Sequence, residues 1–318
     1  MKVYSKEDIR PYMQNPQLMP FIETGLQLAS LGKALEAPWS GLHFLQKDGE
    51  VHVKSAALLN GEFYVVKIAS GFFHNPEKGL ASSNGVVLLF DQNTGELLAI
   101  FLDEGFLTDV RTAVAGAIAA KYLAVSPIDR IGIIGTGTQA KEQLKYLPWI
   151  TDCKKVSIWG RNLNKVETFV QDPELQIFSM KIESNLQRLA ETCNVIVSTT
   201  PSREALLFGD WLQPGTHITA VGADGVGKQE LHASVFEKAD VIIVDHKQQC
   251  RILGDLQHAR EKDVDRVQEL GTWINENSRR EKHWISVADL TGLGLEDLQV
   301  ATALYHWLKN ADSAQRSM

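Results

Sequence analysis

The chain has 318 residues, a length that suggests about two domains and allows a large hydrophobic core without disulfides or a structural metal. Hydrophobic residues make up 44% and charged residues 22%, so the composition is that of a folded globular protein and excludes disordered, collagen-like and low-complexity chains. The formal charge of -7 argues against the basic surface that binds nucleic-acid phosphates, and neither DNA nor RNA is expected as a partner.

The sequence contains no apolar run of the roughly 18 residues that span a bilayer. Residues 1–13 carry several charges and lack the apolar core of a secretory signal. Cys153, Cys193 and Cys250 are widely spaced and form neither a CxxC pair nor a metal-ligand spacing. We therefore expect a cytoplasmic protein without membrane contact or a bound metal.

The first third of the chain contains short, partly alternating apolar runs that predict β-strands. The predicted strands are 51–59, 62–70, 85–91 and 96–103. Asp91–Gly95 is rich in turn-forming residues, so the last two strands are expected to form an antiparallel hairpin. Small and apolar residues then predict a helix over Val110–Val125, capped by Thr108 or Asp109.

From Arg130 onward, short apolar strands alternate with helical segments. The predicted strands are 131–134, 155–159, 195–198, 217–221 and 241–244. This alternation is typical of an α/β domain with a doubly wound parallel sheet, the Rossmann fold. A final amphipathic helix is predicted over Glu296–Leu308, and it is expected to return to the first domain.

A glycine-rich motif joins the first strand of this region to its helix. It consists of Gly135, Thr136, Gly137, Thr138, Gln139 and Ala140. The first glycine permits a tight turn, the second lets backbone amides approach a pyrophosphate, and Ala140 allows close packing of the helix. The motif predicts dinucleotide binding; the alternative is an ordinary glycine-rich loop between a strand and a helix.

The end of the second strand bears on the choice of cofactor. NAD-selective Rossmann domains usually place Asp or Glu there, whereas this chain has Gly160 followed by Arg161. A guanidinium can pair with the 2′-phosphate of NADPH. We therefore predict that NADPH is preferred and NADH is also accepted; the alternative is that Arg161 is a solvated loop residue.

An ordered series of motifs resembles the ornithine cyclodeaminase and mu-crystallin family over nearly the whole chain. The motifs are Val66–Lys67, Gly85 with Asp91 and Thr94–Gly95, Leu107–Ala113, Ile134–Ala140, Val221–Asp224 with Lys228–Leu231, and Asp289–Gly292. The resemblance implies a homodimer with two domains. In it, residues 1–125 form an α+β substrate-binding and dimerisation domain completed by a C-terminal helix at 295–318, and residues 126–294 form the Rossmann NAD(P)-binding domain.

Arg111 is predicted to bind the substrate carboxylate, and Lys67 is predicted to be both a catalytic and a substrate-binding residue. Arg111 lies in the first turn of its predicted helix, where free amides and the helix dipole favour an anion, and by resemblance it clamps this carboxylate. Lys67 stands in an otherwise apolar strand, and by resemblance it faces the substrate and assists. The alternatives are an exposed Arg111 paired with Asp103 or Asp109, and a solvated Lys67 on an edge strand.

Further residues are assigned to the site mainly by resemblance. Asp224 follows a predicted strand at its carboxyl end, and by resemblance it is the general acid or base beside the nicotinamide and the substrate nitrogen; otherwise it caps a helix. Lys54, with His52, is assigned to the substrate end of the pocket, although a solvated strand face fits equally well. Residues that the resemblance places along the cofactor are Thr199, Thr200, Gly222, Asp289 and Gly292.

The leading functional interpretation is NAD(P)H-dependent reduction of a cyclic imino acid. The substrate would be Δ1-pyrroline-2-carboxylate, giving L-proline, or Δ1-piperideine-2-carboxylate, giving L-pipecolate. Cyclodeaminases that resemble this chain keep an acid for NAD and an acid where Lys54 stands, and this chain lacks both. Ornithine cyclodeaminase is therefore the second interpretation, and a non-catalytic, NADPH-binding crystallin-like protein is the third.

Overall fold

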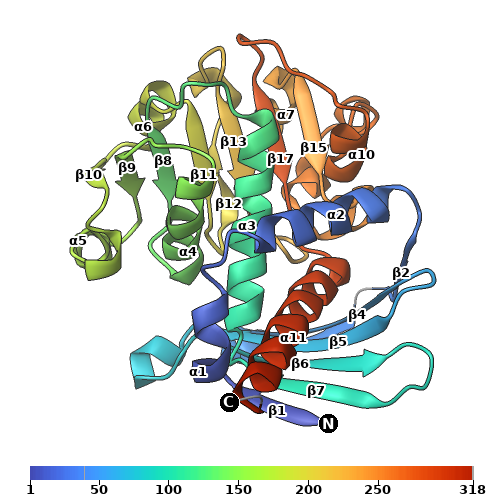
Figure 1. Ribbon diagram of the computed structural model, residues 1–318. Coiled ribbons are helices and arrows are strands. Elements are labelled where there is room, and N and C mark those ends of the chain that lie inside the picture. The colour runs from blue at the N-terminus through green and yellow to red at the C-terminus, as the bar shows by residue number, and fades with distance from the viewer. Residues whose placement is uncertain (39, 317–318) are drawn as a thin grey trace. The chain divides into compact units, whose positions relative to one another are not determined.

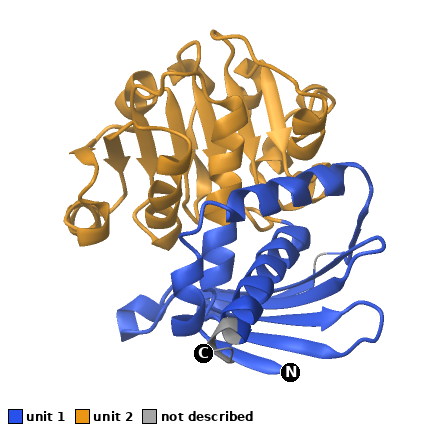
Figure 2. Cartoon of the chain, viewed as in Figure 1, with its two compact units in different colours: residues 1–111, 293–318 blue, residues 112–292 orange. Residues whose placement is uncertain are grey.

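The computed structural model describes residues 1–38 and 40–316, which form two compact units (Figure 2). Unit 1 comprises Met1–Arg111 and Leu293–Met318, and unit 2 comprises Thr112–Gly292. Helix α3, Phe106–Leu123, contributes residues to both units, whereas the sequence-based boundary follows this helix at residue 125. The assignment of substrate binding and dimerisation to the first domain stays a prediction.

Unit 1 contains a mainly antiparallel, seven-stranded sheet. Its strands are β1 Lys2–Ser5, β2 Ala34–Glu36, β3 Ser40–Phe44, β4 Gly49–Leu58, β5 Phe63–Phe72, β6 Ser83–Asp91 and β7 Leu97–Leu102. Their order is β1-β7-β6-β5-β4-β2, β3 pairs with β4, and β1 joins β7 in parallel. The predicted hairpin is confirmed, because β6 and β7 are antiparallel and Asp91 Oδ1 accepts hydrogen bonds from the Asn93 and Thr94 amides.

Helices cover one face of this sheet. Those of unit 1 are α1 Lys6–Ile9, α2 Leu18–Ser30 and α11 Gly294–Arg316, and its 3-10 turns are η1 Arg10–Tyr12, η2 Leu45–Lys47 and η3 Asn75–Lys78. The C-terminal helix α11 lies across strands β4 to β6 (Figure 1). Phe63, Val65 and Lys67 alternate along β5 and are buried on this side, because successive strand residues point to opposite faces.

Unit 2 contains an eight-stranded sheet in which every pair of strands is parallel. Its strands are β8 Ile131–Ile134, β9 Lys155–Trp159, β10 Ser179–Ile182, β11 Val195–Ser198, β13 His217–Ala220, β15 Val241–Val244, β16 Gln268–Glu269 and β17 Ser286–Asp289. The order is β10-β9-β8-β11-β13-β17-β15-β16, while β12 Arg203–Leu207 and β14 Gln229–Leu231 form a separate pair. The predicted α/β fold class with a doubly wound parallel sheet is confirmed.

Separate hydrophobic cores lie on the two faces of the parallel sheet. Val195 and Val197 belong to one core together with Ala140, whereas Ile196 belongs to the other together with Leu189. The helices are α4 Thr138–Tyr146, α5 Leu163–Val170, α6 Leu186–Thr192, α7 Ala233–Lys238, α8 Lys247–Leu253, α9 Glu261–Val264 and α10 Leu270–Asn275. The 3-10 turns are η4 Leu147–Trp149, η5 Pro173–Leu175, η6 Gly209–Trp211 and η7 Asp255–His258.

The start of α3 differs from the prediction. The helix begins at Phe106, and Asp103 Oδ2 accepts a 2.8 Å hydrogen bond from the Leu107 amide, so Asp103 stabilises the helix start in place of Thr108 or Asp109. Arg111 therefore lies in the second turn. The prediction that free amides of a first turn attract an anion to Arg111 is wrong, and an anion bound there is held by the guanidinium itself.

Among residues 1–38 and 40–316, no helix combines the length and the apolar character that crossing a bilayer requires.

Candidate functional site

Unit 1 holds four charged side chains in a buried charge cluster: Lys67, Arg111, Glu296 and Asp297. Lys67 Nζ lies 2.7 Å from Asp297 Oδ2, and Arg111 Nε lies 3.3 Å from Asp297 Oδ1. Arg111 Nη1 also donates a 2.9 Å hydrogen bond to Glu296 Oε2. Each of the four side chains is at most 7% exposed, so two cations and two carboxylates neutralise one another away from solvent.

The start of α11 places the two carboxylates. Glu296 and Asp297 lie in its first turn, where the helix dipole favours negative charge. A Cβ built on Gly294 would lie 3.1 Å from Ala56 Cβ and 3.2 Å from the Ser55 carbonyl oxygen, so glycine lets the helix begin close to β4.

Burial lowers the pKa of Lys67 to about 7, with Asp297 opposing this shift and Arg111 and Lys54 adding to it. The ammonium is therefore poised to lose its proton near neutral pH. The solvated alternatives for Lys67 and Arg111 are wrong, because both side chains are buried. Sequence reasoning missed their partners; the only local signal was an adjacent Glu-Asp pair at the start of the last helix.

Lys54 lies directly opposite Lys67 in the register of β4 and β5. Opposite residues of antiparallel strands project to the same face, so Lys54 shares the face on which α11 lies. His52, two residues earlier, shares that face, and its Nε2 lies 3.4 Å from Glu50 Oε1. Lys54 and His52 are both half-buried, and a substrate contact by either stays a prediction.

The glycine-rich motif of unit 2 has the backbone that a pyrophosphate site needs. Gly135 has φ +121°, a conformation that favours glycine, and its amide donates a 2.9 Å hydrogen bond to the Trp159 carbonyl oxygen. A Cβ on Gly137, at the start of α4, would meet no atom within 4 Å, so the backbone there is open to approach. Ala140 is fully buried, as close helix packing requires.

This loop lies at the point where the strand order of the parallel sheet reverses. The motif follows β8, and Thr199 follows the neighbouring β11, with Thr199 Oγ1 donating to the Ile134 carbonyl oxygen at 3.2 Å. Ligands of open α/β sheets bind at the carboxyl ends of strands at such a point. The motif residues Thr136 and Gln139 are half-buried and Thr138 is exposed. These residues fit a dinucleotide.

Arg161 is exposed in the loop between β9 and α5, where Asn162 caps the helix through a 3.2 Å hydrogen bond from the Lys165 amide. A Cβ on Gly160 would lie 3.0 Å from Thr136 Cγ2 and 3.0 Å from Val166 Cγ2. The glycine thus fits a tight contact with the glycine-rich loop, a role that the sequence did not reveal.

The loop after β13 carries Asp224. It leads to β14, and the next helix, α7, is capped by His232, so the alternative that Asp224 caps a helix is wrong. Lys228 Nζ lies 2.6 Å from Asp224 Oδ1, with the lysine side chain 6% and the aspartate side chain 41% exposed. A buried lysine is therefore in direct contact with a partly accessible aspartate.

A buried glutamate of unit 2, Glu230, holds together the segments that follow β11 and β13. Glu230 accepts hydrogen bonds from the Thr200 amide at 2.6 Å, the Gly222 amide at 2.8 Å and Ser198 Oγ at 3.0 Å. Burial raises the pKa of Glu230. The sequence included this residue in a family motif without revealing that it joins the ends of β11 and β13.

Asp289 and Gly292 were both assigned to the cofactor. Asp289 is fully buried, and its carboxylate holds the chain by accepting hydrogen bonds from the Asp255 amide at 3.1 Å and the Leu256 amide at 2.8 Å; a cofactor contact by Asp289 stays a prediction. Gly292 has φ +78°, and its carbonyl oxygen accepts a 2.8 Å hydrogen bond from Gln249. A cofactor contact by Gly292 stays a prediction.

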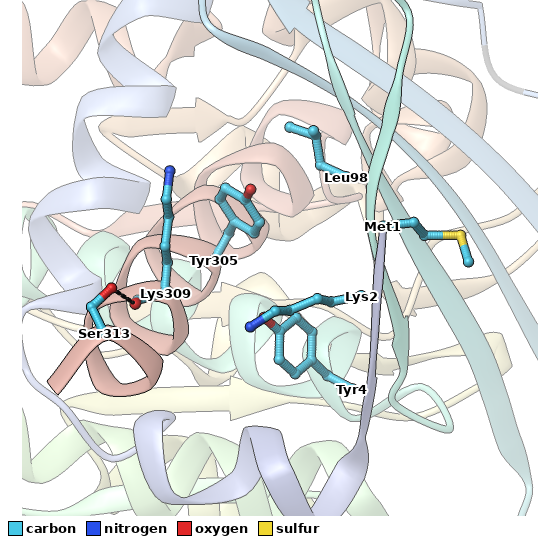
Figure 3. Close-up of a pocket in the computed structure, with 7 residues that line it drawn as sticks. All are labelled: Met1, Lys2, Tyr4, Leu98, Tyr305, Lys309 and Ser313. Carbon is cyan, nitrogen blue, oxygen red and sulfur yellow. Dashed lines mark hydrogen bonds between the residues drawn. The ribbon is translucent and has the colours of Figure 1, made fainter. Parts of the chain in front are cut away.

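A separate cavity of about 320 Å³ lies in unit 1 between β1 and α11 (Figure 3). Its lining residues are Met1, Lys2, Tyr4, Leu98, Tyr305, Lys309 and Ser313. None of them belongs to the predicted site, and the cavity has no part in the function proposed below.

Residues 2–312 match the model of the ornithine cyclodeaminase/mu-crystallin family. The chain belongs to this family. An uncharacterized cyclodeaminase of Sinorhizobium fredii is 37% identical over 264 residues, which cover 81% of this chain and 80% of that protein. The resemblance stated from the sequence motifs is thereby confirmed.

Two solved structures of family enzymes share the whole fold. An archaeal alanine dehydrogenase dimer with bound NAD is 32% identical, has a TM-score of 0.87, and matches 98% of this chain and 96% of its own. The Δ1-pyrroline-2-carboxylate reductase of Thermococcus litoralis, in complex with NADH and L-proline, is 26% identical, with a TM-score of 0.88 and coverage of 96% and 97%. The predicted class, an oxidoreductase that uses a nicotinamide cofactor, is confirmed at the level of the family.

Proposed function

We propose that the protein is an NAD(P)H-dependent reductase of a cyclic imino acid, either Δ1-pyrroline-2-carboxylate or its six-membered homologue. The observation that carries this proposal is the convergence of two buried cations, Lys67 and Arg111, on one carboxylate, that of Asp297. Two cations held this close together attract anions, and the planar donors of Arg111 can pair with the carboxylate of an imino acid as well as with Asp297.

Arg111 and Lys67 bind and orient the substrate. A guanidinium has five N–H donors in a plane, so Arg111 can hold a substrate carboxylate while its contacts with Glu296 and Asp297 persist. Fixing the carboxylate fixes the imine bond next to it, which lowers the entropic part of the barrier. Asp224 gives a proton to the substrate nitrogen and regains one from solvent, and its contact with Lys228 keeps its carboxyl group oriented.

The residues that would hold the cofactor are those of the glycine-rich loop, with Thr199 after the neighbouring strand β11 and Gly292 after β17. A bound NAD(P)H supplies the hydride that the imine carbon receives. Gly160 and the exposed Arg161 support a preference for NADPH over NADH, because a guanidinium suits the 2′-phosphate and no acid stands there to repel it.

A homodimer is also proposed, supported by the open face of the unit 1 sheet, the face opposite α11. Large apolar side chains on this face are between 40% and 61% exposed: Val3, Leu35, Leu42, Phe44, Ile68 and Leu102. Register places them on one side, since Val3 opposes Ile100, Leu35 opposes Ala57 and Leu42 opposes Val51. Exposed apolar side chains gathered on one face of a sheet mark an interface, and a second copy of the chain supplies a matching face.

The function is tested with a panel of substrates, each with NADPH and with NADH. The panel consists of both cyclic imines, pyruvate with ammonium, and L-ornithine. Cofactor oxidation that depends on a cyclic imine and yields the L-amino acid is expected. Arg111→Lys should keep cofactor binding but sharply lower kcat/KM, because lysine keeps the charge and loses the planar fork.

Reductive amination of a 2-oxo acid is a second candidate, favoured by the 32% identity to the archaeal alanine dehydrogenase. Turnover of pyruvate with ammonium, and of no other substrate in the panel, would assign reductive amination to this protein. Ammonia released from ornithine without net cofactor oxidation would assign the cyclodeaminase reaction. A protein that binds NADPH and turns over none of the panel would be the non-catalytic relative.

A further inference from the structure

We infer that Asp297 is a positioning residue of the carboxylate site: it orients the guanidinium of Arg111 and keeps the buried ammonium of Lys67 charged. The inference deepens the proposed function and rests on it for the identity of the substrate, although the state of Lys67 can be measured without any substrate.

The geometry singles out Asp297 within the buried charge cluster. Its Oδ2 lies 2.7 Å from Lys67 Nζ and its Oδ1 lies 3.3 Å from Arg111 Nε, so one carboxylate joins the two cations. Glu296 contacts Arg111 Nη1 at 2.9 Å and is not the carboxylate in contact with Lys67. The two neighbours on α11 are therefore a natural pair of test and control positions.

The charged groups around Lys67 come from four segments of unit 1. Asp297 and Glu296 lie on α11, Arg111 on α3, Lys54 on β4, and Asp103 precedes α3. Burial and the two neighbouring cations favour the neutral amine, whereas Asp297 favours the ammonium. These opposing effects hold the pKa of Lys67 near 7.

The charge of Lys67 matters because a neutral amine attracts a substrate carboxylate weakly. As the pH rises through about 7, the folded protein loses this proton. We therefore expect kcat/KM to fall above that pH. The negative charge of Asp297 stabilises the ammonium form of Lys67. Without that charge, the fall in kcat/KM should begin at a lower pH.

The protonation state of Lys67 is measured by NMR on protein labelled with 13C and 15N at lysine, from the Cε and Nζ chemical shifts across pH. Loss of one signal in Lys67→Arg assigns the resonance. In Asp297→Asn the pKa of Lys67 should fall by about one pH unit or more, since an opposite charge in direct contact contributes that much. Glu296→Gln should leave it nearly unchanged, and Asp297→Glu should restore it.

The same variants are then assayed for imine reduction. At pH 8, Asp297→Asn should show roughly tenfold lower kcat/KM than wild type, and the difference should shrink toward pH 5, where Lys67 is charged in both proteins. A general packing defect would lower kcat/KM equally at every pH. Circular dichroism and melting temperature establish that each variant is folded.

The outcomes separate the inference from the proposed function. A Lys67 resonance whose pKa is unchanged in Asp297→Asn, or moved as far by Glu296→Gln, overturns the role of Asp297. Wild-type protein that reduces no imine overturns the proposed function, while the resonance still decides whether Asp297 controls the charge of Lys67.

Discussion

Asp224 Oδ1 lies 2.6 Å from the Nζ of the buried Lys228, and this contact determines what a substitution at position 224 does. Asparagine keeps the shape of the side chain but has neither the charge nor a proton that titrates. Asp224→Asn should therefore lower kcat by about 10² to 10⁴, as expected for the loss of a general acid or base, and remove one limb of the pH profile. The measurement is steady-state imine reduction across pH.

Stability must be separated from catalysis in this variant, because the side chain of Lys228 is only 6% exposed and loses the carboxylate that lies 2.6 Å from its Nζ. The double variant Asp224→Asn with Lys228→Met removes both charges. It should melt at a higher temperature than Asp224→Asn alone while remaining as slow. Recovery of activity together with melting temperature would mean that Asp224 acts only through structure.

Arg161 provides a test of cofactor choice at the level of one side chain. Because its guanidinium is exposed at the end of β9, Arg161→Ala should leave the fold intact. NADPH affinity should fall roughly tenfold or more, the value of a charge-assisted contact, while NADH affinity stays nearly constant. Fluorescence titration with both cofactors measures this, and an equal loss for both would show that Arg161 does not recognise the 2′-phosphate.

Single residues show where sequence reasoning succeeds and where it stops. Lys67 stands out because a lysine in an apolar strand conflicts with its surroundings, and Gly135 stands out because its motif has a fixed local geometry. Glu296 could not be assigned to Arg111, since the two are separated by 185 positions and no local pattern specifies such a contact. The sequence therefore showed which residues are unusual for their surroundings, but it did not show which distant residues contact them.

Two glycines of unit 2 serve different purposes at the level of loops and helices. A Cβ on Gly222 would run into the backbone of Thr200 and lie 2.6 Å from Glu230 Oε2, so the loop carrying Asp224 cannot accept a side chain there. A Cβ on Gly137 would meet nothing within 4 Å. The first glycine is required by packing within the chain, and the second leaves room for a ligand.

Gly222→Ala should therefore destabilise the protein by about 1 to 3 kcal/mol, the usual cost of overpacking, and lower kcat by displacing the Asp224 loop. Gly137→Ala should keep the melting temperature of wild type but weaken cofactor binding. Differential scanning calorimetry and cofactor titration distinguish the two. Equal melting temperatures for both variants would contradict the packing role of Gly222.

The limits of a helix or strand were predictable from the sequence where its own residues form a clear pattern. The central strands β8, β9, β11 and β15 match their predicted limits, because each is a short apolar run preceded or followed by a turn. The short edge strand β16 has only two residues and no apolar run, and it forms because β15 offers an edge. Strands that depend on a neighbour cannot be read from their own sequence.

At the scale of the whole molecule, the open face of the unit 1 sheet is the main feature that local reasoning did not anticipate. Alternation along β5 predicts that one face is buried, and Val65 on that face is fully buried under the cover of α11. The opposite face is also apolar, as Ile68 and Leu102 illustrate. The apolar face that the helices leave exposed needs a partner to cover it.

A second copy of the chain meets this requirement, so wild-type protein should sediment with twice the mass of one chain. Ile68→Lys combined with Leu102→Lys places two charges in the middle of the open face and should yield a monomer with unchanged helix content, since burying unpaired like charges is costly. Ile177→Lys, at an apolar residue of unit 2 that is 58% exposed, is the matched control and should leave the dimer intact. Analytical ultracentrifugation measures all three proteins. A wild-type monomer, or a dimer that survives both lysines, would mean that this face is covered in another way, and the dimer contact would then have to be sought elsewhere on the chain.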